Sequence, residues 1–215
     1  MKRSLLTAFC SFSLMLCFAQ MGEGSKQVYS SPKLKEAVAA HKNVAILPFK
    51  ATISYKKVPK DFNAEANKAE EQNLALQMQS GMYTYLLKKA KNFSVTFQDV
   101  DRTNALLRQA GVFDNVDLLT QDSICKILKV DAAIKCTYSY ERTSTEGGAM
   151  VKGLLFGSGA ANTGTGSLVM QLYDGADGEL LWRFYKSMNE NLAGGANQVM
   201  ERMMRKVARN FPYEK

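Results

Sequence analysis

Three stretches in the second half of the chain alternate apolar and polar residues, and this period of two constrains the fold more than any other feature. The first stretch follows Asp131, and the other two flank a glycine-containing turn over residues 174–178. The apolar positions are Ile134, Cys136, Tyr138, Tyr140, then Leu168, Met170, Leu172, and then Leu180, Trp182, Phe184. Side chains of a strand point alternately to the two faces of a sheet, so each stretch predicts a strand with one buried face. The last two predict a hairpin.

Helical periodicity marks the segments around these strands. Over residues 64–91, four apolar side chains recur at four-residue spacing: Leu74, Met78, Met82 and Leu86. A short helix is expected from Asp99 or Asp101 to Gly111, since an aspartate favours a helix start and a glycine favours a helix end. A second short helix is expected from Thr120, and a last one over residues 196–210.

Two further apolar runs, over residues 44–49 and 93–97, predict short strands, and Pro48 ends the first because proline cannot donate to a ladder. Residues 51–63 carry several lysines and predict an exposed loop. Strands and helices alternate first, and a hairpin and a helix follow. This order predicts one α/β domain with a mixed sheet covered by helices, and no internal repeat interrupts it.

The N-terminus has the pattern of a secretory signal. Lys2 and Arg3 precede an apolar stretch that is too short to span a membrane. We expect a signal peptide over residues 1–19, cut after Ala19, a polar leader over residues 20–42, and the domain over residues 43–213. A lipoprotein cut before Cys17 is the alternative. Cleavage after Ala19 removes Lys2 and Arg3 and no acidic residue, so the formal net charge falls from +8 to +6.

Two cysteines remain after such a cut, and both interpretations of them stay open. In an exported protein Cys125 and Cys136 can form a disulfide. Free cysteines also pack in cores as small apolar side chains. Cys125 falls on a predicted helix and Cys136 on the strand that follows.

The second half of the chain resembles the curli-secretion channel family (CsgG). The resemblance rests on Tyr140-Glu-Arg-Thr-Ser-Thr-Glu-Gly-Gly148, Gly153-Leu-Leu-Phe-Gly157, Leu168-Val-Met-Gln-Leu-Tyr-Asp174 and Gly178-Glu-Leu-Leu181. The same core is shared with the penicillin-binding-protein activator LpoB and the N-terminal domain of TolB. The resemblance covers about residues 43–213 and implies the CsgG periplasmic α/β domain. It departs from the channels in two respects. The channels carry a lipobox, whereas here Leu16 stands before Cys17 in place of a small residue, and the last helix follows Phe184 too closely for their second membrane hairpin.

A glycine-rich segment between the long strands is the candidate functional loop. Its candidate membrane or partner contacts are Gly148, Met150, Lys152, Leu154, Leu155, Phe156 and Gly157. Membrane strands need about 9–11 residues, so one hairpin beginning at Gly148 and ending at Val169 is long enough. Such a hairpin closes a barrel only in an oligomer, because an open sheet edge is not tolerated in lipid. The alternatives are a flexible surface loop or a segment that packs on a partner.

The chain lacks a recognisable catalytic or cofactor site. The single histidine, His41, is expected to be solvated in the polar leader, and one histidine excludes histidine-cluster metal sites. The aspartates Asp99, Asp101 and Asp131 stand at element starts, where capping accounts for them. The basic positions of the last helix are expected to face water: Arg202, Arg205, Lys206 and Arg209. The glycines fit no phosphate-binding fingerprint.

These features predict an exported, non-enzymatic protein of the periplasm or outer-membrane periphery, acting as a scaffold or accessory in assembly or secretion. Its expected partners are envelope proteins or copies of itself, with the outer membrane as a further contact and no nucleic acid or cofactor. The alternative is an oligomeric outer-membrane channel component with the single hairpin at 148–169.

Overall fold

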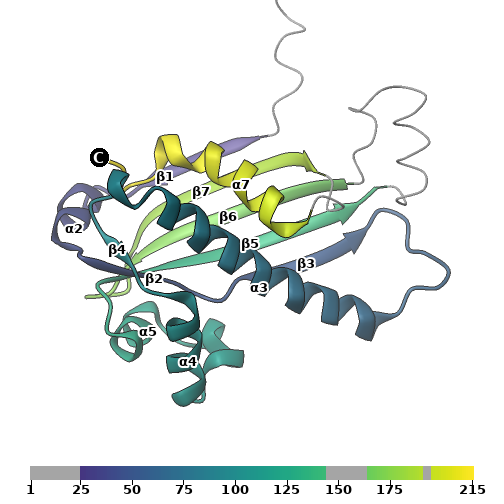
Figure 1. Ribbon diagram of the computed structural model, residues 1–215, viewed down its shortest axis with the longest axis horizontal. Coiled ribbons are helices and arrows are strands. Elements are labelled where there is room, and N and C mark those ends of the chain that lie inside the picture. Colours follow the sequence, from purple (N-terminus) through teal and green to yellow (C-terminus); the bar gives the residue numbers. More distant parts are fainter. Residues whose placement is uncertain (1–24, 144–163, 191–194) are drawn as a thin grey trace, which may run out of the picture.

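A computed structural model describes residues 25–143, 164–190 and 195–215, and its centre is a mixed sheet (Figure 1). The strands are β1 (Lys26–Ser30), β2 (Asn43–Ile46), β3 (Lys50–Tyr55), β4 (Thr96–Phe97), β5 (Ala132–Arg142), β6 (Gly164–Asp174) and β7 (Leu180–Glu190). Their order is β1-β7-β6-β5-β2-β4, and β3 also pairs with β5. The β5, β6 and β7 strands are antiparallel neighbours, whereas β2 and β3 run parallel to β5. The predicted α/β class with a mixed sheet is confirmed.

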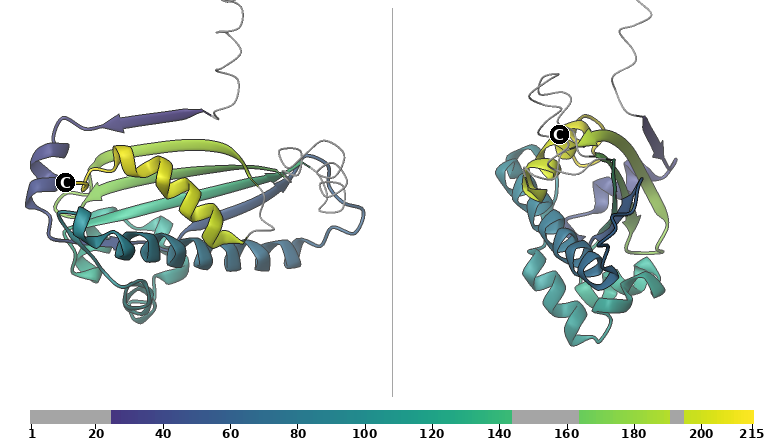
Figure 2. Two further views of the ribbon diagram at one scale, coloured as in Figure 1. Left: turned by 45° about the horizontal axis from the view of Figure 1, so that its top comes forward. Right: turned by 90° about the vertical axis from the view of Figure 1, so that its right-hand side faces the viewer.

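Helices cover both faces of this sheet unequally (Figure 2). The α-helices are α2 (Leu34–Ala40), α3 (Ala64–Lys88), α4 (Val100–Gln109), α5 (Gln121–Leu128) and α7 (Ala196–Val207), and the 3-10 helices are η2 (Ala90–Asn92), η3 (Phe113–Leu118) and η6 (Ala208–Asn210). The long helices α3 and α7 lie across one face and bury the predicted apolar positions of β5 and β6. In β7 they bury the predicted Trp182 and Phe184, but Leu181 is buried in place of the predicted Leu180. The shorter helices α4, η3 and α5 cover the other face where β2 meets β5. No helix of the described residues combines the length and apolar character needed to cross a bilayer.

The break between β2 and β3 is set by Pro48. The Leu47 amide donates to the Ile134 carbonyl of β5 at 2.9 Å, and β3 then resumes pairing with β5 at Lys50, opposite Thr137. Proline has no N–H and cannot continue the ladder, so the chain leaves β5 between these points. The long strand β5 is therefore bordered first by β2 and then by β3, with a gap in the pairing at Pro48.

Two strands were missed by the sequence analysis. Residues 26–30, expected in a polar leader, form β1, which pairs antiparallel with β7. Residues 50–55, expected largely in an exposed loop, form β3, in which Ala51 and Ile53 are buried. β1 has no buried residue and shows no alternation. β3 does alternate, but its six residues run directly into a segment rich in lysines, which indicates an exposed loop. The predicted signal peptide over residues 1–19 lies outside the described residues.

The last six residues of the predicted membrane hairpin, Gly164 to Val169, belong to the sheet of the domain. Gly164 and Gly166 lie in β6, between β5 and β7, and the strand continues through Val169. A Cβ on Gly166 would stand 2.4 Å from the Tyr138 hydroxyl, and one on Gly164 would stand 2.2 Å from the Glu141 carbonyl oxygen. These glycines therefore leave room for the tyrosine side chains of β5 and the adjacent backbone. A membrane strand over residues 160–169 is wrong at least from Gly164 onward.

The last helix also differs from its predicted solvation. Val199, Met203 and Val207 are buried as expected, but Arg202 forms an ion pair and hydrogen bonds with Glu190 of β7. The Glu190 side chain is only 1% exposed, so Arg202 is the partner of a buried carboxylate. Removing one member of such a pair leaves an uncompensated buried charge.

We expect the substitution Gly166→Ala to destabilise the fold by about 1–3 kcal/mol, because the added methyl group must displace the buried Tyr138 ring. Urea unfolding of purified protein, followed by circular dichroism, measures the change. Ser167→Ala is the matched control, since Ser167 is the next residue of β6 and is half-buried on the other face. Equal stability of the two variants would contradict this explanation of the glycine.

Candidate functional site

The break between β2 and β3 opens a cavity of about 570 Å³ at the sheet edge. Its lining comes from four elements: Leu47, Pro48, Phe49 and Lys50 of the break, Gln72, Ala75 and Leu76 of α3, Phe113, Asp114, Val116 and Asp117 of η3, and Lys135 and Cys136 of β5. Lys135 and Cys136 lie on β5 between the end of its β2 pairing and the start of its β3 pairing. The proline that interrupts the ladder thus also creates the cavity.

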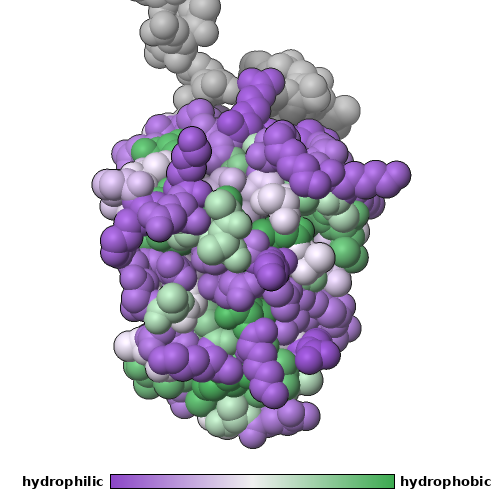
Figure 3. All heavy atoms as spheres, turned by 90° about the vertical axis from the view of Figure 1, so that its left-hand side faces the viewer, coloured by the Kyte–Doolittle hydropathy of each residue, from purple (hydrophilic) through white to green (hydrophobic). Residues whose placement is uncertain are grey.

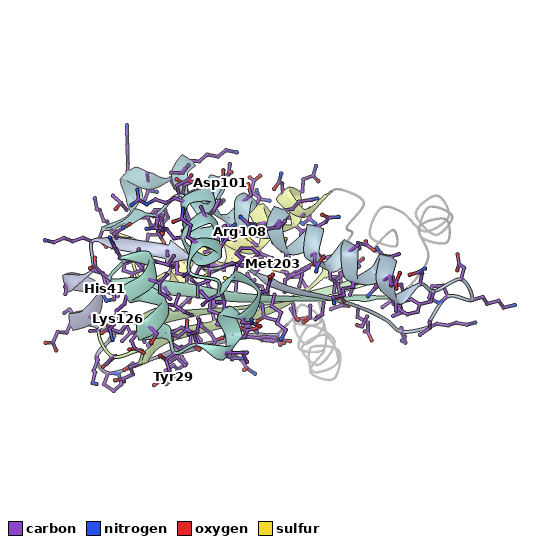
Figure 4. All side chains as sticks on the ribbon, turned by 90° about the horizontal axis from the view of Figure 1, so that it is seen from below. Tyr29, His41, Asp101, Arg108, Lys126 and Met203 are labelled. Atoms are coloured by element: carbon purple, nitrogen blue, oxygen red, sulfur yellow. The ribbon has the colours of Figure 1, made fainter. Side chains whose placement is uncertain are left out.

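A second hollow of about 390 Å³ continues the first along α3. It is lined by residues of α3, α4 and the start of α7: Leu76, Gln77, Gln79, Ser80, Val100, Asp101, Asn104, Arg108 and Asn197. Leu76 borders both hollows, and its side chain is 45% exposed. We call the two hollows together the α3 groove. Figure 4 labels Asp101 and Arg108 on α4, at its second hollow.

A buried amide pair fixes the wall of the α3 groove. Gln79 of α3 and Asn104 of α4 exchange hydrogen bonds at 3.0 and 2.9 Å, and Gln79 also donates to the Ile46 carbonyl at 2.9 Å. Both side chains are buried. Because a buried amide without partners costs free energy, these bonds hold α3, α4 and the end of β2 in one arrangement.

The charged groups of the first hollow are largely paired with each other. Lys135 Nζ lies 2.6 Å from one oxygen of Asp117, and Lys50 Nζ lies 3.7 Å from the other. The hydrogen bond from Lys135 holds the pKa of Asp117 below its ordinary value, against the opposing effect of partial burial. Leu118, the last residue of η3, follows the lining residue Asp117 in the chain, and its side chain is 82% exposed. The first hollow therefore combines apolar lining residues with opposite charges that are bridged to each other, which suits contact with apolar side chains.

The candidate loop residues lie outside the described residues. These are Gly148, Met150, Lys152, Leu154, Leu155, Phe156 and Gly157, and their role stays a prediction. The β5 and β6 strands that flank the segment are described, and Arg142 pairs with Gly164 at its base.

The two cysteines are free and buried in different parts of the core. Cys136 packs with α3 on one face of the sheet, where its sulfur lies 3.9 Å from that of Met82. Cys125 packs with the α4–α5 cluster on the other face. The sheet separates them, so the disulfide interpretation is wrong and the buried apolar interpretation applies. Burial raises the pKa of the Cys125 thiol to about 12, and burial also raises the pKa of Cys136.

His41 is not solvated as predicted. Its ring is 7% exposed, its Nδ1 lies 2.7 Å from the Tyr213 hydroxyl, and its Nε2 lies 3.5 Å from Asp174. Burial, together with Asp174 and Asp131, raises the pKa of Tyr213, so this phenol is not an activated nucleophile. His41, Tyr213 and Asp174 thus join the end of α2, the C-terminal tail and the β6–β7 turn. These segments are distant in the sequence, so no local sequence pattern predicts the contact.

Of the three aspartates expected to cap element starts, Asp99 caps a helix, Asp101 lies in the first turn of α4, and Asp131 bonds to the neighbouring strand. Asp99 caps α4 by accepting from the Arg102 amide at 3.0 Å. Asp131 accepts from the amides of Lys42 and Asn43 at the start of β2, and these bonds lower its pKa against the effect of burial. No group of three acidic, cysteine or histidine side chains in the described parts of the chain is arranged to hold a metal ion.

Comparison with known proteins finds distant similarity of structure. No family model and no curated protein sequence matches the chain. The chain is similar to the lipoprotein GNA1162 from Neisseria meningitidis, with a TM-score of 0.47 and 13% identity over 78% of this chain and 99% of that one. It is similar to the PelC dodecamer from Paraburkholderia phytofirmans, with a TM-score of 0.45 and 10% identity over 89% and 99%. The C-terminal domain of LpoB from Salmonella enterica gives 0.35 and 15% over 74% and 94%.

LpoB is also one of the proteins that share the core which the sequence resembles. The similarity to the curli-secretion channels stays a prediction from the sequence. What the α3 groove contacts is therefore argued below from its own residues.

We expect both cysteines to resist a thiol reagent at pH 8 in the folded chain, because the thiols are buried and protonated. In a chain that begins at Gln20, both should react in urea without any reductant. Absorbance of the released thiolate counts the reactive groups. A disulfide would leave the unfolded chain unreactive until a reductant is added.

We also expect Lys135→Met to raise the pKa of Asp117 toward its ordinary value. The carboxylate form, and with it the bridge to Lys135, is fully present above the unfolded pKa and is lost as the pH falls through the lowered folded pKa. Carbon-13 NMR titration of the side-chain carboxyl measures the change. Lys57→Met, on the exposed β3–α3 connection, is the control and should leave the pKa of Asp117 unchanged. An unaltered pKa in both variants would show that the bridge does not form in solution.

Proposed function

We propose that this chain is an exported, non-enzymatic protein of the cell envelope that acts as a scaffold or accessory factor in assembly or secretion. In this proposal the α3 groove holds an apolar segment of a partner polypeptide. The single observation that carries the proposal is the construction of the groove: apolar side chains line its first hollow, Asp117 is bridged there to Lys135 and Lys50, and the exposed Leu76 borders both hollows.

The exposed leucines support a protein partner over a small substrate. Leu76 lies between the two hollows, and Leu118 follows the lining residue Asp117 in the chain. Large apolar side chains exposed next to a concave surface are typical of contacts with other proteins. The amide pair of Gln79 and Asn104 supports a preformed surface, because it fixes α3 and α4 before any partner arrives.

Export supports the envelope location and rests on the N-terminal pattern of Lys2, Arg3 and the apolar stretch after them. Cell fractionation tests this part. Protein in the periplasmic or outer-membrane fraction would support the proposal, and protein confined to the cytoplasm would contradict it. An alkaline carbonate wash of wild type and of a variant lacking residues 148–163 then separates peripheral from membrane-inserted protein. Release of wild type by the wash would argue against the alternative membrane hairpin.

Photocrosslinking in living cells tests the groove. We expect a photoreactive residue at position 76 or 118 to yield one discrete crosslinked species, because both positions border the proposed contact. Position 126 is the control, since Lys126 is exposed on α5 away from the groove lining. The substitution Leu118→Glu should weaken the crosslink at position 76 by about tenfold, as expected for loss of an apolar anchor. Equal crosslinking at all three positions would contradict a contact in the groove.

A further inference from the structure

The outer edge of β1 presents unused backbone hydrogen-bonding groups. Ser25 accepts from Ser187 of β7 at 3.0 Å, and Ser31 donates to Leu181 at 2.8 Å. In an antiparallel ladder, alternate residues bond to the same neighbour. Lys26, Val28 and Ser30, which lie between these two positions, therefore turn their N–H and C=O groups away from β7. Among the described residues, no other strand pairs with β1.

The opposite side of the sheet is closed differently. Ile53 of β3 has its amide bonded to Glu71 of α3 at 2.7 Å and its carbonyl bonded to Asn67 at 3.3 Å. Side chains of α3 thus occupy the backbone groups of that edge. The β1 edge has no such cover among the described residues, and all five of its residues are exposed. Exposed edges of this kind are templates for pairing with another strand.

We propose that β1 pairs antiparallel with β1 of a second copy of this chain, about a two-fold axis at Val28. In this register Val28 faces itself, and Lys26 faces Ser30 of the second copy. These are the residues whose backbone groups point outward, so each meets a matching donor and acceptor. The Val28 side chain, now 42% exposed, lies on the same face as buried Phe184 and extends the core across the axis.

The charges along β1 favour this antiparallel arrangement with a second copy. At the start of the strand, Lys26 stands opposite Lys186 of β7. At its end, Asp177 and Glu179 share the single cation Lys33, and Glu179 also accepts from Ser31. The start of β1 therefore carries the exposed cation Lys26, and its end lies beside two carboxylates that share Lys33. The two-fold axis sets the basic end of one copy against the acidic end of the other, whereas a parallel pairing would set like charges together.

This dimer does not depend on the α3 groove. Tyr29 on β1 and Arg108 on α4 lie on opposite sides of the molecule in Figure 4. Both surfaces thus remain available at the same time, and a dimer would carry two grooves. Failure of the dimer would leave the proposed groove contact untouched.

Sedimentation velocity over a concentration series tests the proposal with the purified exported chain. The wild type should shift from monomer to dimer, and Val28→Pro should weaken the dimer at least about tenfold, because proline removes an outward amide without touching a bond to β7. Leu118→Glu, at the groove, is the control and should dimerise as the wild type does. A wild type that remains monomeric at all concentrations would overturn the proposal.

Engineered cysteines test the register without relying on a proline. Val28→Cys should form a disulfide-linked dimer on mild oxidation, since position 28 faces itself across the axis. Tyr29→Cys should not, because position 29 faces Gln27 of the second copy. The native cysteines are buried and do not compete. Equally fast crosslinking of the two variants would overturn the register and with it the proposed axis.

Discussion

The missing amide of Pro48 is the constraint on which the architecture of this domain depends. The eleven residues of β5 need backbone hydrogen-bond partners along the edge that faces β2 and β3. The chain that borders this edge cannot stay paired through the proline. It satisfies the edge in two pieces, β2 and β3, and swings outward between them. That excursion places Leu47 and Phe49 on opposite faces of the sheet and opens the floor of the α3 groove. A single residue type thus decides both the topology at this edge and the position of the first hollow of the α3 groove.

The sequence predicts the helices and strands that bury apolar side chains at a regular period. It does not predict the strands that are held mainly by backbone pairing with a neighbouring strand. The strands β5, β6 and β7 and the helices α3, α4, α5 and α7 follow from apolar spacing and helix caps, because each buries a series of apolar side chains at its own period. The edge strand β1 buries nothing, and its pairing with β7 is a backbone property that side-chain patterns do not encode. β3 is hidden by Lys50 and by the lysines that follow it. Helix and strand types were therefore predictable, and both additional edge strands were not.

The residues of the candidate site are harder still to predict from the sequence. Its constituents come from α3, η3, β5 and the β2–β3 break, which lie far apart in the chain, so no local motif brings them together. His41 and Arg202 were predicted to be exposed for the same reason: each is a polar residue in a polar segment, and the partner that buries it is distant in the sequence. For glycine the error is the reverse, because a buried segment was predicted to be a loop. Gly164 and Gly166 suggest a mobile loop, but they are small because Tyr138 and Tyr140 stand over them.

The two outer edges of the sheet are closed in different ways. The end near α2 and the C-terminus presents mostly hydrophilic residues in Figure 3, with small apolar areas between them. The β3 edge is closed by Glu71 and Asn67, so α3 serves at once as a wall of the groove and as the cover of that edge. A substitution in α3 near Glu71 therefore affects both the wall of the groove and the cover of the β3 edge. Among the described residues no helix lies beside the outer edge of β1, and a second strand would supply backbone groups in the required alternation. The chain thus closes one edge with its own side chains and, in our proposal, the other with a copy of itself.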